Sequence, residues 1–80
     1  MAETIVYLGM PEVSEAGRFW RVSCMARLGT EDERAEPHYL RLCKDGVWDG
    51  DAINGELFDS EGQARQALAG AKMKGRHVRP

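Results

Sequence analysis

The sequence has few cysteines and no long hydrophobic run. Cys24 and Cys43 are the two cysteines among 80 residues, too few for a disulfide scaffold, which indicates a reducing compartment. No window approaches 18 consecutive apolar residues, which excludes a membrane-spanning helix. The N-terminal residues also lack the basic segment and apolar core of a secretory signal. We therefore expect a single compact cytoplasmic domain over residues 1–80, with residues 76–80 as a frayed tail.

The sequence also lacks the motifs of common phosphate and metal sites. Its nine glycines are scattered and form neither the G-x-x-x-x-G-K nor the G-x-G-x-x-G pattern. The candidate zinc ligands are Cys24, His38, Cys43 and His77. No pair of them has the short spacing of structural zinc sites. Asp49 and Asp51 begin like a calcium loop, but the twelfth position is Ser60, where that loop needs a glutamate. We therefore expect no metal, no cofactor and no enzymatic activity.

Alternation of apolar and polar residues predicts most of the strands. It is clearest over residues 18–28, where every second residue from Trp20 to Leu28 is apolar. Residues 4–8 are mostly β-branched or aromatic, residues 38–44 alternate again, and residues 56–58 suggest a short further strand. Asp45-Gly46 predicts a tight turn that leads into a returning strand at Val47-Trp48.

One helix is predicted in the C-terminal part of the chain. Ser60 and Gln63 have the spacing of a capping box. The apolar stripe that follows consists of Ala64, Ala67, Leu68 and Ala71. Gly75 is the expected C-cap, with Lys72 and Lys74 near the negative helix end. The sequence therefore predicts an α+β fold, a small antiparallel sheet of three to four strands with one C-terminal helix packed across one face.

Charge is distributed unevenly along the chain. Residues 1–61 carry all 13 acidic residues and six of the 11 basic ones, whereas residues 62–80 carry five basic residues and no acid. One acidic stretch covers residues 31–36, and the other covers residues 45–61. Such a split between segments is typical of surfaces that contact charged partners.

We name the second acidic stretch the acidic edge. Its members are Asp45, Asp49, Asp51, Glu56, Asp59 and Glu61. They are expected on a turn, a loop and a helix start, which could meet at one edge of the sheet. A dense row of carboxylates imitates a phosphate backbone and is steered onto proteins that bind DNA or RNA. Trp48 lies among these acids and is the candidate apolar anchor for such a partner.

Two acidic stretches on a compact α+β pattern without a catalytic motif resemble small phage-encoded anti-CRISPR proteins. The resemblance is one of general type over the whole chain, and no functional residue is carried over from it. It implies a non-enzymatic inhibitor in the cytoplasm of a host bacterium. Such an inhibitor binds a CRISPR effector protein and blocks its access to target DNA, and we expect it to bind no nucleic acid itself.

Two other hypotheses stay open at this point. The basic residues Lys72, Lys74, Arg76 and Arg79 could bind phosphates, which would make the chain a small nucleic-acid-binding module. Alternatively, Phe19 and Met25 fall on the nominally polar face of their strand, which favours a homodimer through an uncovered sheet face.

Overall fold

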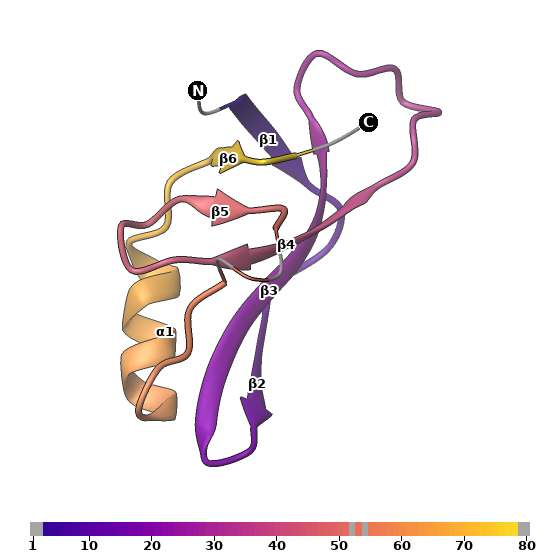
Figure 1. Ribbon diagram of the computed structural model, residues 1–80. Coiled ribbons are helices and arrows are strands. Elements are labelled where there is room, and N and C mark those ends of the chain that lie inside the picture. Colours follow the sequence, from indigo (N-terminus) through magenta and orange to yellow (C-terminus); the bar gives the residue numbers. More distant parts are fainter. Residues whose placement is uncertain (1–2, 52, 54, 79–80) are drawn as a thin grey trace.

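The protein is mostly β-structure, with six strands and one short helix (Figure 1). The computed structural model describes residues 3–51, 53 and 55–78. Its elements in chain order are β1 (Glu3–Tyr7), β2 (Glu12–Ala16), β3 (Phe19–Leu28), β4 (His38–Leu42), β5 (Trp48–Asp49), α1 (Glu61–Ala69) and β6 (Lys74–Arg76). The sheet order is β1-β6-β5-β4-β3-β2, and β1 also pairs with β3. This additional pairing closes β1, β6, β5, β4 and β3 into a five-stranded barrel.

The predicted open sheet of three to four strands is therefore wrong. The closing strand is β6, which pairs antiparallel with β1 and parallel with β5. The sequence signal misled because Gly75, taken as a helix C-cap, is the central residue of β6. A Cβ at this position would lie 2.9 Å from Cγ2 of Ile5 and 3.0 Å from Cγ2 of Val78. Only glycine lets the closing strand pack this tightly against the core.

The long strand β3 organises the barrel. Its first half pairs with β2, its second half pairs with β1, and its central residues pair with β4 on the other side. The strands expected at residues 4–8, 18–28 and 38–44 correspond to β1, β3 and β4. Strand β2 has no counterpart among the predicted strands, and residues 56–58 contribute only an isolated bridge between Phe58 and Trp20.

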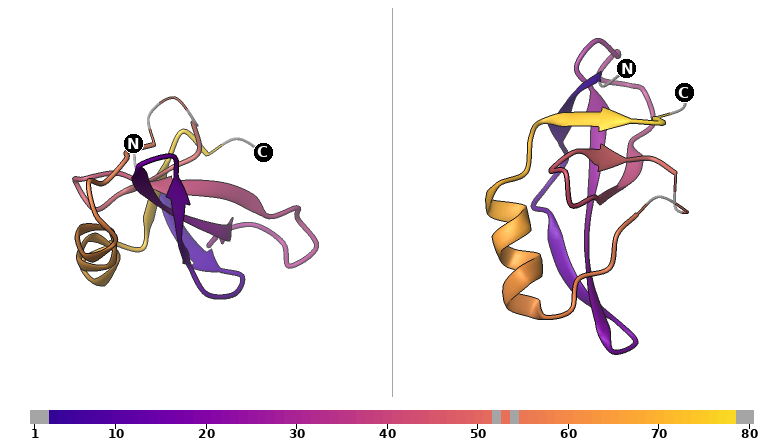
Figure 2. Two further views of the ribbon diagram at one scale, coloured as in Figure 1. Left: turned by 90° about the horizontal axis from the view of Figure 1, so that it is seen from below. Right: turned by 60° about the vertical axis from the view of Figure 1, so that its left-hand side comes forward.

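The helix α1 begins as predicted and ends earlier. The Ser60 side chain accepts a hydrogen bond from the Gln63 backbone N–H at 3.1 Å, as expected for an N-cap. Gly70, five residues before the expected C-cap, ends the helix and donates its N–H to the carbonyls of Gln66 and Ala67. The helix packs beside the hairpin of β2 and β3 rather than across an open sheet face (Figure 2).

Trp48 is the largest fully buried side chain and fills the barrel. Its indole Nε1–H donates to the Tyr7 hydroxyl at 3.1 Å, and the two rings meet edge to face with centroids 5.7 Å apart. This satisfies the polar atom of a buried tryptophan. Aliphatic side chains that surround it in the core include Ile5, Leu40 and Leu42.

Candidate functional site

The structure gathers two members of the acidic edge around Arg76. The Asp49 side chain is completely buried, and its carboxylate accepts hydrogen bonds from Arg76 Nε at 2.9 Å, from His77 Nδ1 at 3.1 Å and from the Asp51 backbone N–H at 2.8 Å. Asp45 accepts a bond from a terminal nitrogen of Arg76 at 2.5 Å. These contacts link β5 to β6, so this part of the acidic edge stabilises the barrel closure.

Hydrogen bonding decides the ionisation of these two carboxylates. Burial alone would raise the pKa of Asp49, but the hydrogen bonds from Arg76, the Asp51 amide and His77 outweigh it and lower that pKa. The hydrogen bond from Arg76 also lowers the pKa of Asp45. Both carboxylates, in turn, raise the pKa of the Arg76 guanidinium. Asp45, Asp49 and Arg76 are therefore all charged at neutral pH.

The remaining members of the acidic edge lie on the surface with local partners. Glu56 is 3.7 Å from Lys44, and Glu61 pairs with Arg65 one helical turn along α1 at 2.8 Å. The Asp51 carboxylate accepts the backbone N–H of Ile53, and Asp59 is exposed. The six acids therefore do not form one bare surface.

Trp48 and Asp49 are corrected as partner-contacting residues. Trp48 is 0% exposed and Asp49 is 1% exposed. Both side chains are buried, so a partner protein cannot contact them. The alternation of acids and aromatics in the sequence could not show this. Burial of Asp49 depends on Arg76, which is 27 residues away in the sequence and lies in the neighbouring strand β6.

The basic C-terminal residues are also placed differently from the prediction. Helix α1 has no basic residue in its last turn, so Lys72 and Lys74 do not cap it. Both are exposed, whereas Arg76 is bonded to Asp45 and Asp49. Arg79 lies outside the described residues. Lys72, Lys74 and Arg76 therefore do not form the expected basic helix end.

A different basic surface lies on the outside of the barrel, across β3 and β4. We name it the arginine–tyrosine face and define it as Arg21, Ser23, Met25, Arg27, Tyr39 and Arg41. Cross-strand register places these residues together, because Ser23 is opposite Arg41 and Met25 is opposite Tyr39. They alternate with the core residues of the same strands, so they point outward.

Tyr39 is the centre of the arginine–tyrosine face. Its ring is 50% exposed, and the guanidinium carbon of Arg41 is 5.8 Å from the ring centroid. Hydrogen bonding to Ser23, helped by Arg41 and Arg21, lowers the pKa of the Tyr39 phenol although partial burial opposes it. The Nε atoms of Arg21 and Arg27 are buried and bond to no described residue. Tyr39 is therefore a half-exposed residue with arginines beside it, and Glu12, opposite Ser23 on β2, lines the same hollow.

The part of this face that lies on β3 can be predicted from the sequence. The residues on the polar side of β3, including Arg21 and Arg27, are visible from alternation alone. What the sequence does not give is the register with β4, which brings Tyr39 and Arg41 beside them. Met25, which looked out of place on a polar side, is 40% exposed and lies next to the Tyr39 ring.

Phe19 has a local partner of its own. It is half-buried, and the guanidinium carbon of Arg18 lies 5.5 Å from its ring centroid. Phe19 is the first residue of β3, six residues before Met25. The two residues therefore do not form one apolar patch, and self-association through them stays a prediction for sedimentation to test.

The structure also bears on metal binding and on membrane spans. Within residues 3–51, 53 and 55–78, no three His, Cys, Asp or Glu side chains are grouped so that they could hold a metal ion. The same part of the chain contains no helix long and apolar enough to cross a membrane.

Fold and site together define a small closed β-barrel that carries a basic and aromatic outer face. No protein-family model matches the sequence, and neither the curated proteins nor the solved structures contain a significant match. The function of this protein is therefore inferred from its own side chains.

Proposed function

We propose that this protein is a non-enzymatic module that binds single-stranded nucleic acid through its arginine–tyrosine face. The observation that carries the proposal is the half-exposed Tyr39, which lies with the partly buried Arg21, Arg27 and Arg41 on the outer side of β3 and β4. Aromatic rings on which bases stack, combined with basic side chains along the backbone path, are the recurring elements of single-strand binding.

The dimensions of the face suit a chain of nucleotides. Arg21 and Arg27 are six residues apart on β3, which separates them by roughly 20 Å along the strand. Met25 lies between them and extends the apolar surface beside the Tyr39 ring. Besides Nε, the guanidinium groups of Arg21 and Arg27 each carry terminal N–H donors that can bond to phosphate oxygens. Arginine is also well suited to bidentate phosphate contacts.

The test is fluorescence anisotropy with a labelled single strand of about 12 nucleotides, first at low salt of about 25 mM. We expect Tyr39→Leu to weaken binding by about 10-fold, because base stacking on an aromatic ring is lost. Arg21→Gln with Arg27→Gln should weaken binding by a similar factor and reduce its salt dependence.

Arg65→Gln is the matched control, since Arg65 is an exposed arginine on α1, away from the face. It should bind like the wild type. A wild-type protein that binds no single strand at low salt, or an Arg65→Gln effect as large as that of the double variant, would contradict the proposal.

The exposed acids favour a second candidate function, inhibition of a CRISPR effector. Asp59 and Glu61 are exposed at the start of α1, and Glu56 is partly exposed just before them. A partner lined with Lys and Arg would be attracted to this group and sterically prevented from binding target DNA. This candidate uses a different part of the molecule from the arginine–tyrosine face.

Replacing Glu56, Asp59 and Glu61 with lysine should then reduce inhibition of target cleavage by at least about 10-fold, because attraction becomes like-charge repulsion. Circular dichroism should show an unchanged fold. The control is Glu12→Lys with Glu15→Lys, two exposed acids on β2. Unchanged inhibition by the triple variant, or a wild-type protein that does not inhibit, would exclude this mechanism.

A further inference from the structure

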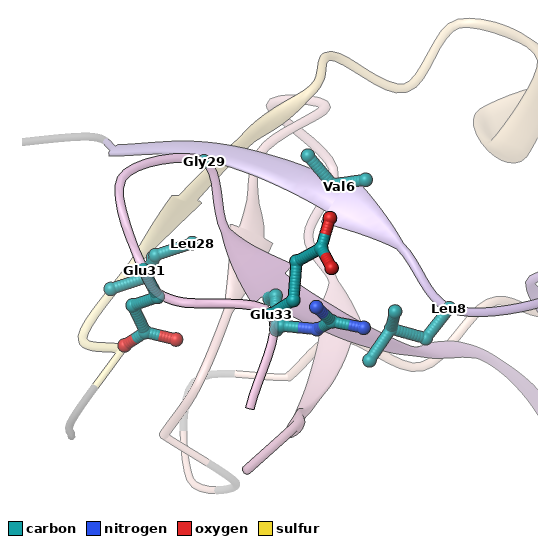
Figure 3. Close-up of a pocket in the computed structure, with 7 residues that line it drawn as sticks. Val6, Leu8, Leu28, Gly29, Glu31 and Glu33 are labelled. Carbon is teal, nitrogen blue, oxygen red and sulfur yellow. The ribbon is translucent and has the colours of Figure 1, made fainter. Parts of the chain in front are cut away.

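A pocket of about 340 Å³ opens beside the arginine–tyrosine face, between β1 and the loop that follows β3 (Figure 3). Its apolar walls are Val6, Leu8 and Leu28, and its polar groups come from Arg27, Glu31 and Glu33. Leu8 also lines a smaller hollow of about 100 Å³ that contains Met25 and Tyr39. A single nucleic-acid strand bound on Tyr39 would therefore reach the pocket directly.

The register of β1 and β3 places the pocket directly beside the arginine–tyrosine face. Val6 is directly opposite Arg27, and the Leu8 backbone N–H donates to the Met25 carbonyl at 2.8 Å. Val6 is 52% exposed, so the pocket wall is open to a ligand. Arg27 belongs both to the arginine–tyrosine face and to the pocket, where one end of the bound strand would meet it.

The polar groups of the pocket combine a donor with an acceptor. Arg27 supplies guanidinium donors. The Glu33 carboxylate is exposed, and it forms no hydrogen bond or ion pair with any residue that the structure describes. Figure 3 shows it directed toward Val6 across the pocket, whereas the Glu31 carboxylate points away from it. Glu31 is also bonded to His38 at 3.2 Å. Glu33 is therefore the available acceptor.

We propose that this pocket receives one unpaired guanine of the bound strand, an inference that rests on the proposed function. The guanine edge presents two adjacent N–H donors, which a carboxylate accepts as a pair, beside a carbonyl oxygen, which an arginine donates to. Thymine and uracil have one edge N–H, and adenine and cytosine place an acceptor nitrogen beside their amino group. Thymine or uracil would form one hydrogen bond with the Glu33 carboxylate. Adenine or cytosine would place its acceptor nitrogen against a carboxylate oxygen, which repels it. The apolar walls contact the base plane.

The experiment compares oligothymidine strands that carry one central guanine, adenine, cytosine or thymine. Wild-type protein should bind the guanine strand about 10-fold more tightly, the discrimination of one good bidentate pair. Replacing guanine by inosine removes the exocyclic amine and should remove most of this preference. Glu33→Gln should reduce the preference to within about twofold, because the amide no longer accepts two donors. The control Glu36→Gln changes another exposed acid of the same loop that does not line the pocket and should keep the preference.

The outcomes separate the two proposals. Equal binding of all four strands by the wild type, or a guanine preference that survives in Glu33→Gln, overturns the guanine pocket and leaves the arginine–tyrosine face intact. Absence of binding to every strand overturns the proposed function itself.

Discussion

Replacing Trp48 by alanine is expected to destabilise the protein by about 4 kcal/mol. The indole is 0% exposed, and its removal leaves a large cavity at the centre of the barrel. It also leaves the Tyr7 hydroxyl without its hydrogen-bond donor. A domain of this size has a total stability of roughly 4–12 kcal/mol, so the variant loses much of it. Urea denaturation followed by circular dichroism measures the loss.

Trp48→Phe is the informative comparison. A phenyl ring retains most of the buried apolar surface and an edge contact with Tyr7, while the N–H donor is lost. We expect it to cost about half as much as the alanine variant. If Trp48→Ala unfolds at the same urea concentration as the wild type, Trp48 is not the core residue described above.

Replacing Asp49 by asparagine is expected to cost about 2–3 kcal/mol, because it removes the buried charge that holds Arg76 and His77. The loss is at the lower end for a buried pair because the Arg76 side chain is 32% exposed. Asp45→Asn is the matched control, since Asp45 bonds to the same arginine from a half-exposed position. It should cost less than about 1 kcal/mol. Equal losses in the two variants would show that burial of Asp49 is unimportant.

The lowered pKa of Asp49 predicts how the free energy of unfolding changes in acid. The pKa of Asp49 is lowered in the folded protein, whereas an unfolded aspartate has a pKa of about 3.9. The unfolded chain therefore binds more protons near pH 4, and stability falls as the pH falls through the folded pKa. Asp49→Asn should lose this part of the pH dependence while remaining less stable at pH 7. Denaturation curves between about pH 2 and pH 7 distinguish the two proteins.

Local patterns in the sequence were sufficient for several elements. β-branched and aromatic residues located β1, alternation located β3 and β4, and the cap residues Ser60 and Gln63 located the start of α1. The Asp45-Gly46 turn located β5, which follows it at Trp48–Asp49 and pairs with β4. The barrel itself could not be predicted in this way. Strand β6 has three residues, too few for a period to show, and its pairing with β1 and β5 joins segments far apart in the sequence.

The candidate site was harder to predict than the fold. An acidic residue in the sequence looks the same whether it is exposed like Asp59 or buried like Asp49. The difference arises from Arg76, which reaches Asp49 only when β6 lies beside β5. The arginine–tyrosine face likewise depends on register between β3 and β4, since a shift of one residue would turn Tyr39 to the other side of the sheet.

The position of β6 has a consequence for assembly of the chain. This strand is hydrogen-bonded on both sides, to β1 and to β5, although it is the last element in sequence. Until its residues are in place, β1 and β5 each present an unpaired edge, and two unpaired edges on one molecule are a template for pairing between copies. Nearby hairpins such as β2 with β3 and β4 with β5 close over short loops, whereas the ring closes only across almost the whole described chain. The three residues from Lys74 to Arg76 thereby protect the protein against aggregation as well as completing its barrel.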